Sequence, residues 1–118
     1  MQPLAKAKRI RMYVSENDRV GHRPAHLAVL ELLRRERASG ATVLHGIEGF
    51  GGSRVVHTAN LGDVVERLPV IIEWIDTPEA VERLWPRLRE MLPGSLITCD
   101  DTEVLAGTGD RPAARPSG

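Results

Sequence analysis

The stretch that decides the fold is residues 40–54, which read GATVLHGIEGFGGSR. A short β-type run, residues 41–44, leads into a segment with glycine at positions 46, 49, 51 and 52. Glycine loses more backbone freedom on folding than any other residue, so this density needs a reason. Two reasons are open: a flexible hairpin loop, or a backbone that offers its N–H groups to an anionic ligand, assisted by Arg54 and His57.

Apolar periodicity predicts the elements on either side of this stretch. Alternation predicts a strand over residues 9–14, followed by a polar loop over residues 15–23. Pro24 then begins a helix whose apolar positions recur at the spacing of an amphipathic stripe. Gly40 ends that helix or opens the strand over residues 41–44.

The second half of the chain repeats this order. Residues 69–75 predict a strand with both faces covered, because their apolar run is broken only by Glu73. Thr77 caps a second helix, in which Pro86 predicts a kink or a division. Short strands are expected over residues 96–99 and 103–105.

The order strand, helix, strand, loop, strand, helix, strand predicts an α+β fold. It is the ferredoxin-like β-α-β-β-α-β sandwich, with an antiparallel sheet and two helices on one face. The other face carries Tyr13 and part of residues 69–75, and an open apolar face favours a homo-oligomer. Residues 1–8 are expected to be a flexible N-terminus, residues 9–106 the domain, and residues 107–118 a disordered tail.

Composition narrows the function classes. The chain of 118 residues fits one domain, and its 16 basic residues balance its 16 acidic ones. A balanced charge argues against a nucleic-acid partner, which requires a basic excess. Cys99 is the single cysteine, which fits a cytoplasmic protein without disulfides. No apolar run approaches membrane-spanning length, so direct membrane insertion is not expected.

Three short motifs carry a resemblance to a known family. Residues 40–43 (GATV), 46–51 (GIEGFG) and 57–58 (HT) together resemble the PII-like proteins grouped as domain of unknown function 190. The resemblance covers about residues 8–105 and implies a homotrimer of ferredoxin-like subunits. It also implies a regulatory protein that binds a small anionic ligand, with an adenine nucleotide expected, in clefts between subunits. The loop over residues 45–68 would then control a membrane transporter or an enzyme.

The resemblance also implies a set of ligand-binding residues. Thr42 would lie on the strand leading into the cleft, and the loop base would comprise Gly49, Phe50, Gly51, Gly52, Ser53 and Arg54. One departure concerns residues 93–95 (PGS), which stand where PII proteins have a phosphate-gripping Gly-Asp-Gly-Lys turn. The alternative function is therefore an interaction module for a transporter or enzyme that needs no small ligand.

Other polar residues allow more than one interpretation. His57, which flanks the loop together with His45, is a candidate ligand contact or forms a structural hydrogen bond. Arg11 would pair with Glu73 or bind a ligand phosphate. Asp100 and Asp101 are expected in a solvated turn.

The sequence gives little support for catalysis or metal binding. No nucleophile–base constellation is visible, so an enzyme is not expected, and a hydrolase that uses His57 is the weakest hypothesis. His22 and His26 have the i, i+4 spacing of a metal pair, but no Cys or carboxylate at ligand spacing completes the set. They are interpreted as surface histidines, and no metal is predicted.

Overall fold

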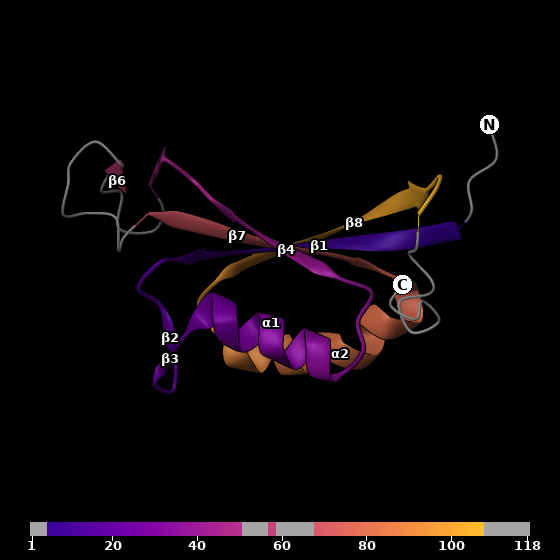
Figure 1. Cartoon of the computed structure of the whole chain (residues 1–118), viewed down its shortest axis with the longest axis horizontal. Coiled ribbons are helices and arrows are strands. Elements are labelled where there is room, and N and C mark those ends of the chain that lie inside the picture. Colours follow the sequence, from indigo (N-terminus) through magenta and orange to yellow (C-terminus); the bar gives the residue numbers. More distant parts are fainter. Residues whose placement is uncertain (1–4, 51–56, 59–67, 108–118) are drawn as a thin grey trace.

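The chain folds into a four-stranded antiparallel sheet covered on one face by two helices (Figure 1). The computed structural model describes residues 5–50, 57–58 and 68–107. The sheet has the order β4-β7-β1-β8, and its strands are β1 (Ala5–Ser15), β4 (Ala41–His45), β7 (Pro69–Asp76) and β8 (Leu96–Val104). Helices α1 (Ala25–Arg35) and α2 (Pro78–Met91) lie side by side beneath it. The predicted ferredoxin-like sandwich is confirmed.

The core lies between the sheet and the helices. Alternate residues of the two central strands point into it: Ile10, Met12 and Val14 of β1, and Val70, Ile72 and Trp74 of β7. The stripe predicted for the first helix is buried in full, comprising Ala25, Ala28, Val29, Leu32 and Leu33. From α2 the core receives Val81, Leu84 and Leu88. The apolar residues that alternate along the strands and those that recur every 3.6 residues along the helices therefore pack together in one aliphatic layer around Trp74.

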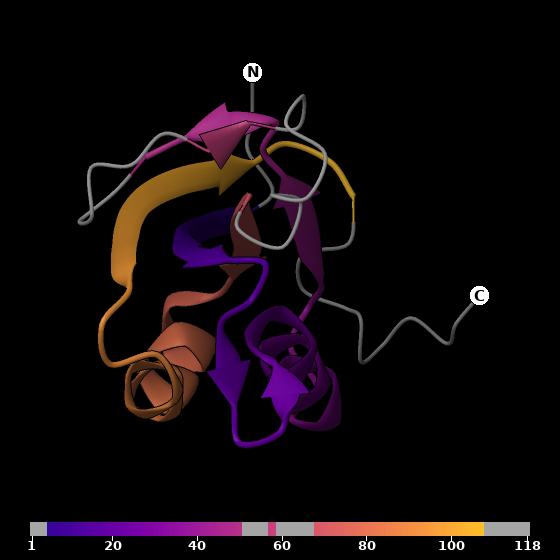
Figure 2. The same cartoon turned by 90° about the vertical axis from the view of Figure 1, so that its left-hand side faces the viewer.

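Two small hairpins accompany the main sheet. The polar segment expected as a loop over residues 15–23 contains β2 (Arg19–Val20), which pairs with β3 (Arg23–Pro24). In the long connection after β4, β5 (Glu48–Gly49) pairs with β6 (His57–Thr58), so this connection begins as a hairpin (Figure 2).

Two of the strands, β1 and β8, are longer than the sequence pattern indicates. β1 begins at Ala5 rather than residue 9, because residues 5–8 pair with the end of β8. β8 is one strand where two were expected, because it pairs with β1 along its length. The solvated turn expected at Asp100 and Asp101 was wrong. These residues lie within β8, where they accept hydrogen bonds from Arg9 and Lys8.

Helix α2 begins as predicted and does not divide. The Thr77 hydroxyl accepts a hydrogen bond from the Ala80 backbone N–H at 3.1 Å, which confirms the cap. The helix continues through Pro86, so of the two alternatives, a kink or a division, the division is excluded. The missing N–H weakens this turn. Val81 and Leu88 anchor the two halves in the same core, and their burial keeps the helix continuous.

One buried carboxylate joins three segments at the far end of β7. Asp76 is 6% exposed. One of its oxygens accepts from the Trp74 indole N–H and the Ser39 backbone N–H, both at 2.9 Å. The other accepts from the Thr77 backbone N–H at 2.8 Å. Asp76 thus holds the core tryptophan, the α1–β4 connection and the start of α2 together.

Replacing this carboxylate should destabilise the whole domain. Asp76→Ala leaves three donors without their acceptor, the buried Trp74 indole N–H and two partly buried backbone N–H groups. We therefore expect the free energy of unfolding to fall by roughly 3 kcal/mol. Asp76→Asn, which keeps one acceptor oxygen, should lose less. Urea denaturation followed by tryptophan fluorescence measures both. Asp101→Ala is the matched control, because its ion pair with Lys8 is exposed and should contribute little. Equal losses at positions 76 and 101 would contradict the assignment.

Candidate functional site

An open cleft of about 990 Å³ lies at the end of the sheet that carries the two small hairpins. Residues 46–50 border it on one side, and the turn between α2 and β8, residues 91–96, borders it on the other. The end of β1 with the following residues, up to Arg19, forms its floor together with Pro69 and Ile71 of β7. The cleft has the size of a small-molecule site.

The strand order explains why these segments meet. β1 and β7 are antiparallel, so the residues after β1 lie beside those before β7. β4 also runs antiparallel to β7, and β8 antiparallel to β1. The end of β1, the end of β4, the start of β7 and the start of β8 therefore share one edge of the molecule.

The lining combines apolar and charged residues. Its apolar residues include Tyr13, Ile71, Met91, Leu92 and Leu96. Among the described residues of the lining, the ionisable groups with formal charge at neutral pH are Asp18, Arg19 and Glu48. The Asp18 carboxylate already accepts from the Ser15 backbone N–H at 2.9 Å. A phosphate here would therefore require positive charge beyond that of the described lining.

The residues expected to bind a ligand do not all meet at the cleft. Gly49 and Phe50 line it, and Gly49 pairs through its backbone with His57. Thr42 and Arg11 lie outside it, on the open sheet face. The remaining predicted loop-base residues, Gly51, Gly52, Ser53 and Arg54, lie outside the described residues.

Arg11 pairs with Glu73, one of the two partners that the sequence allowed, the other being a ligand phosphate. Its Nε lies 3.0 Å from a carboxylate oxygen of Glu73, its cross-strand neighbour. Nearby on the same face, Arg9 donates to Asp100 at 2.6 Å, and this hydrogen bond lowers the pKa of the Asp100 carboxyl. The same bond raises the pKa of Arg9. These guanidinium groups thus already have carboxylate partners.

One row of side chains on the open sheet face is apolar. Cross-strand register places Leu44, Ile71, Tyr13 and Leu96 in one row across all four strands. Leu44 is 48% exposed and Leu96 is 64% exposed. The next row, Thr42, Glu73, Arg11 and Thr98, is polar. An exposed apolar row of this kind is typical of a face that another surface covers.

Two of the glycines have a reason that does not require a ligand. The Gly46 backbone N–H donates to the Pro69 carbonyl at 2.7 Å, and a Cβ on Gly46 would lie 2.7 Å from the Pro69 ring. A Cβ on Gly49 would lie 3.1 Å from the same ring. The loop base therefore needs glycine because it packs closely against Pro69, which the sequence alone did not reveal.

Asp18 and Arg19 also line the cleft, although the sequence does not mark them as candidates. Their segment looked like an ordinary polar loop, and no motif marks it. The signal that could have found them is topological: once the strand order is fixed, the residues after β1 must reach the edge where the glycine-rich connection begins. The turn at residues 93–95 lines the same cleft as Phe50.

Comparison with known proteins shows which family has this fold. The chain belongs to the family of domain of unknown function 190, described as an uncharacterized ACR, whose model matches residues 7–104. A UPF0166 protein of Methanocaldococcus jannaschii is 35% identical over 105 residues, which are 88% of this chain and 96% of that protein. One from Aquifex aeolicus is 30% identical over 102 residues, which are 86% and 96% of the two chains.

Solved structures of low identity share the fold. CPII of Thiomonas intermedia K12, a nitrogen regulatory PII-like protein bound to ADP, AMP and bicarbonate, has a TM-score of 0.57 at 16% identity, covering 86% of this chain and 91% of that one. A putative PII-like signaling protein of Thermus thermophilus has a TM-score of 0.55 at 21% identity, covering 87% and 91%. The divalent ion tolerance protein CutA1 of Ehrlichia chaffeensis has a TM-score of 0.57 at 9% identity, covering 88% and 85%. At these identities the likeness is one of fold.

Among the described residues, neither helix is long and apolar enough to cross a membrane.

The packing of the loop base on Pro69 can be tested by a double-mutant cycle. Gly46→Ala places a methyl group against the Pro69 ring, and we expect it to lower the free energy of unfolding by about 1–3 kcal/mol. In a Pro69→Ala background the same change should cost much less, because the ring is gone. Gly94→Ala is the control in the same cleft, since its Cβ would meet no atom within 4 Å. Chemical denaturation measures all four variants, and additive losses in the cycle would contradict the contact.

Proposed function

We propose that this chain is a PII-like regulatory protein without catalytic activity, acting in the cytoplasm. It binds a small anionic ligand, an adenine nucleotide, in clefts between the subunits of a homotrimer. The ligand sets the conformation of the connection over residues 45–68, which then binds or releases a target transporter or enzyme. Such a switch requires that the ligand bind the two loop conformations with different affinity.

The observation that carries this proposal is the position of the cleft. It joins the base of the glycine-rich connection to the turn at residues 93–95, so one ligand would touch both. The lining has apolar surface for a base and polar rim positions for a phosphate chain. The fold neighbour CPII contains ADP and AMP, which supports the same ligand class here.

The charge of the lining favours a site completed by a second subunit. The described lining has the carboxylates of Asp18 and Glu48 but one guanidinium, that of Arg19. Arg19 forms no ion pair with another residue of the described ranges, so it can turn toward a phosphate. Arg54 and a neighbouring subunit would add the remaining positive charge. The apolar row on the open face gives that neighbour a surface to pack against.

Nucleotide titration tests the ligand. Isothermal calorimetry of the full chain with ATP, ADP, AMP and cyclic nucleotides should give a saturable heat for at least one of them. Arg54→Ala and Arg19→Ala should each weaken binding by roughly tenfold or more, because each removes a charged hydrogen-bond donor. Arg35→Ala, on the exposed last turn of α1, is the control and should leave affinity unchanged.

The outcomes separate the two functions. If none of these nucleotides gives a saturable heat at millimolar concentration, the ligand proposal is overturned. Capture of a target that requires residues 45–68 but not nucleotide would then support the ligand-independent interaction module. Capture that changes with added nucleotide supports the switch.

The homotrimer is tested on the apolar row. Light scattering of the wild-type chain should give the mass of three subunits. Leu44→Asp, and separately Leu96→Asp, should release monomers, because a carboxylate buried in each of three symmetric contacts costs several kcal/mol. Leu27→Asp is the control, since Leu27 is similarly exposed at 44% but lies on α1, in the helical layer. A monomeric wild type, or equal dissociation by Leu27→Asp, would count against this face as the interface.

A further inference from the structure

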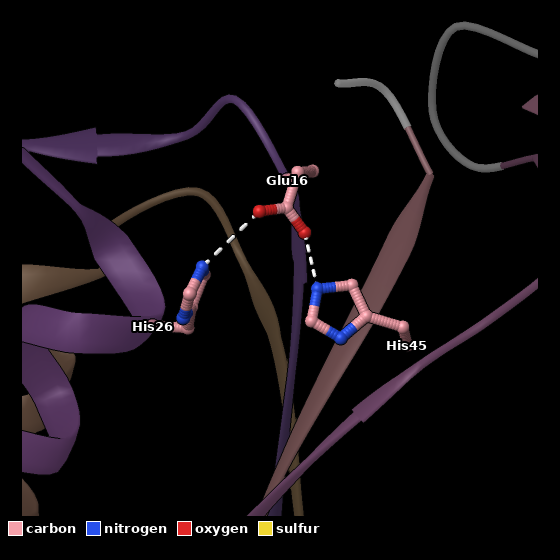
Figure 3. A group of neighbouring side chains, drawn as sticks. All are labelled: Glu16, His26 and His45. Atoms are coloured by element: carbon pink, nitrogen blue, oxygen red, sulfur yellow. Dashed lines mark hydrogen bonds and ion pairs between the residues drawn. The ribbon is translucent and has the colours of Figure 1, made fainter. Parts of the chain in front are cut away.

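Two histidines and a glutamate from separate segments converge in the fold (Figure 3), and each is adjacent in the chain to a residue that lines the cleft. Glu16 follows β1 directly, His26 lies in the first turn of α1, and His45 ends β4. The His26 Nε2 lies 3.3 Å from one oxygen of the Glu16 carboxylate, and the His45 Nε2 contacts the other oxygen. All three ligand-capable atoms lie within 4.8 Å of one another.

The backbone fixes all three positions. The Glu16 N–H donates to the Leu68 carbonyl at 3.0 Å. The start of α1 is held by the Ala25 N–H, which donates to the Asp18 carbonyl at 2.8 Å. His45 pairs with Val70 in the β4–β7 ladder. The cluster is therefore built by the sheet edge and the helix start, so it does not depend on the chance approach of surface side chains.

The structure does not pair His26 with His22, the histidine at i, i+4 spacing in the sequence, but groups it with Glu16 and His45. His26 was considered with His22, four residues earlier, and the missing third ligand argued against a metal. In the fold, the third ligand is Glu16 and the second imidazole comes from His45. Glu16 is ten residues before His26, and His45 is nineteen after it, so no local spacing rule reveals the group.

We propose that Glu16, His26 and His45 bind a divalent transition-metal ion, with Zn²⁺ as the expected ion. Tetrahedral zinc with bonds of 2.0–2.1 Å keeps its ligand atoms about 3.3 Å apart, and the His26–Glu16 pair already has this separation. Two imidazoles and one carboxylate form a donor set that zinc accepts with one position open. The burial matches an accessible site: the side chains of His26, Glu16 and His45 are 13%, 25% and 50% exposed.

The ion would join the two segments that border the cleft. Glu16 precedes the residues around Arg19 at the cleft rim, and His45 precedes Gly46 at the base of the glycine-rich connection. Binding would thus reinforce the corner from which residues 46–50 extend. The metal proposal does not depend on nucleotide binding, because none of its three ligands is needed to hold a nucleotide.

Titration of the EDTA-treated full chain with Zn²⁺ alone tests the site. Calorimetry should show one ion per chain, and Co²⁺ should give the visible absorption of a tetrahedral site. His26→Ala and His45→Ala should each weaken Zn²⁺ binding by at least about 100-fold, since loss of a direct ligand exceeds the usual 10–100-fold cost of an outer partner. Glu16→Gln should weaken it as well. Thermal unfolding should show that Zn²⁺ stabilises the wild type and no longer stabilises these variants.

His22→Ala is the matched control, because His22 is exposed and lies outside the cluster. It should bind Zn²⁺ as the wild type does. His45 is half-exposed, so replacing it carries little risk to folding. If His26→Ala is unstable, the Zn²⁺ affinity of His45→Ala tests the proposal. Absence of stoichiometric binding, or an equal loss at positions 22 and 45, overturns the proposal and leaves a structural ion-pair cluster.

Discussion

The fold depends most on how the end of β7 is held. Asp76 is the last residue of the central strand β7. Its carboxylate accepts hydrogen bonds from the Ser39 backbone N–H after α1, from the Thr77 backbone N–H before α2 and from the indole N–H of the core residue Trp74. A buried carboxylate is costly unless its oxygens are fully hydrogen-bonded, and here three N–H groups satisfy them. This fixes where α2 starts and where β4 begins. The register of the sheet then determines which residues appear at its opposite end.

That register separates two kinds of surface. On the helix-covered face, the even-numbered residues from 10 to 14 in β1 and from 70 to 74 in β7 belong to the core. On the open face, cross-strand neighbours form an apolar row beside a polar one. The polar row is internally paired through Arg11 and Glu73, so its charge is already compensated. The open face is thus suited to packing against another surface, and the candidate ligand-binding cleft lies at the end of the sheet.

Periodicity predicts most of the fold and little of the site. The stripe of α1, the cap at Thr77 and the central strands follow from local patterns, and the structure confirms them. The extension of β1 and the single strand β8 were missed because their outer residues are held by pairing, and alternation alone does not reveal pairing. Asp18, Arg19 and Glu16 were missed for a related reason. They follow a strand in an ordinary polar turn, and strand order alone brings them to the cleft and to His45.

The glycine-rich stretch has a structural cause that its composition alone does not reveal. The composition allows flexibility or a ligand as its reason, yet the Pro69 ring at the start of β7 leaves no room for a side chain at Gly46 and little room at Gly49. Close packing and ligand binding are compatible, because the same contact brings the backbone of residues 46–50 to the cleft. It also places His45 at the end of a paired strand, within reach of Glu16. A small, rigid loop base therefore gives one corner of the molecule both a cleft and a cluster of ligand-capable side chains.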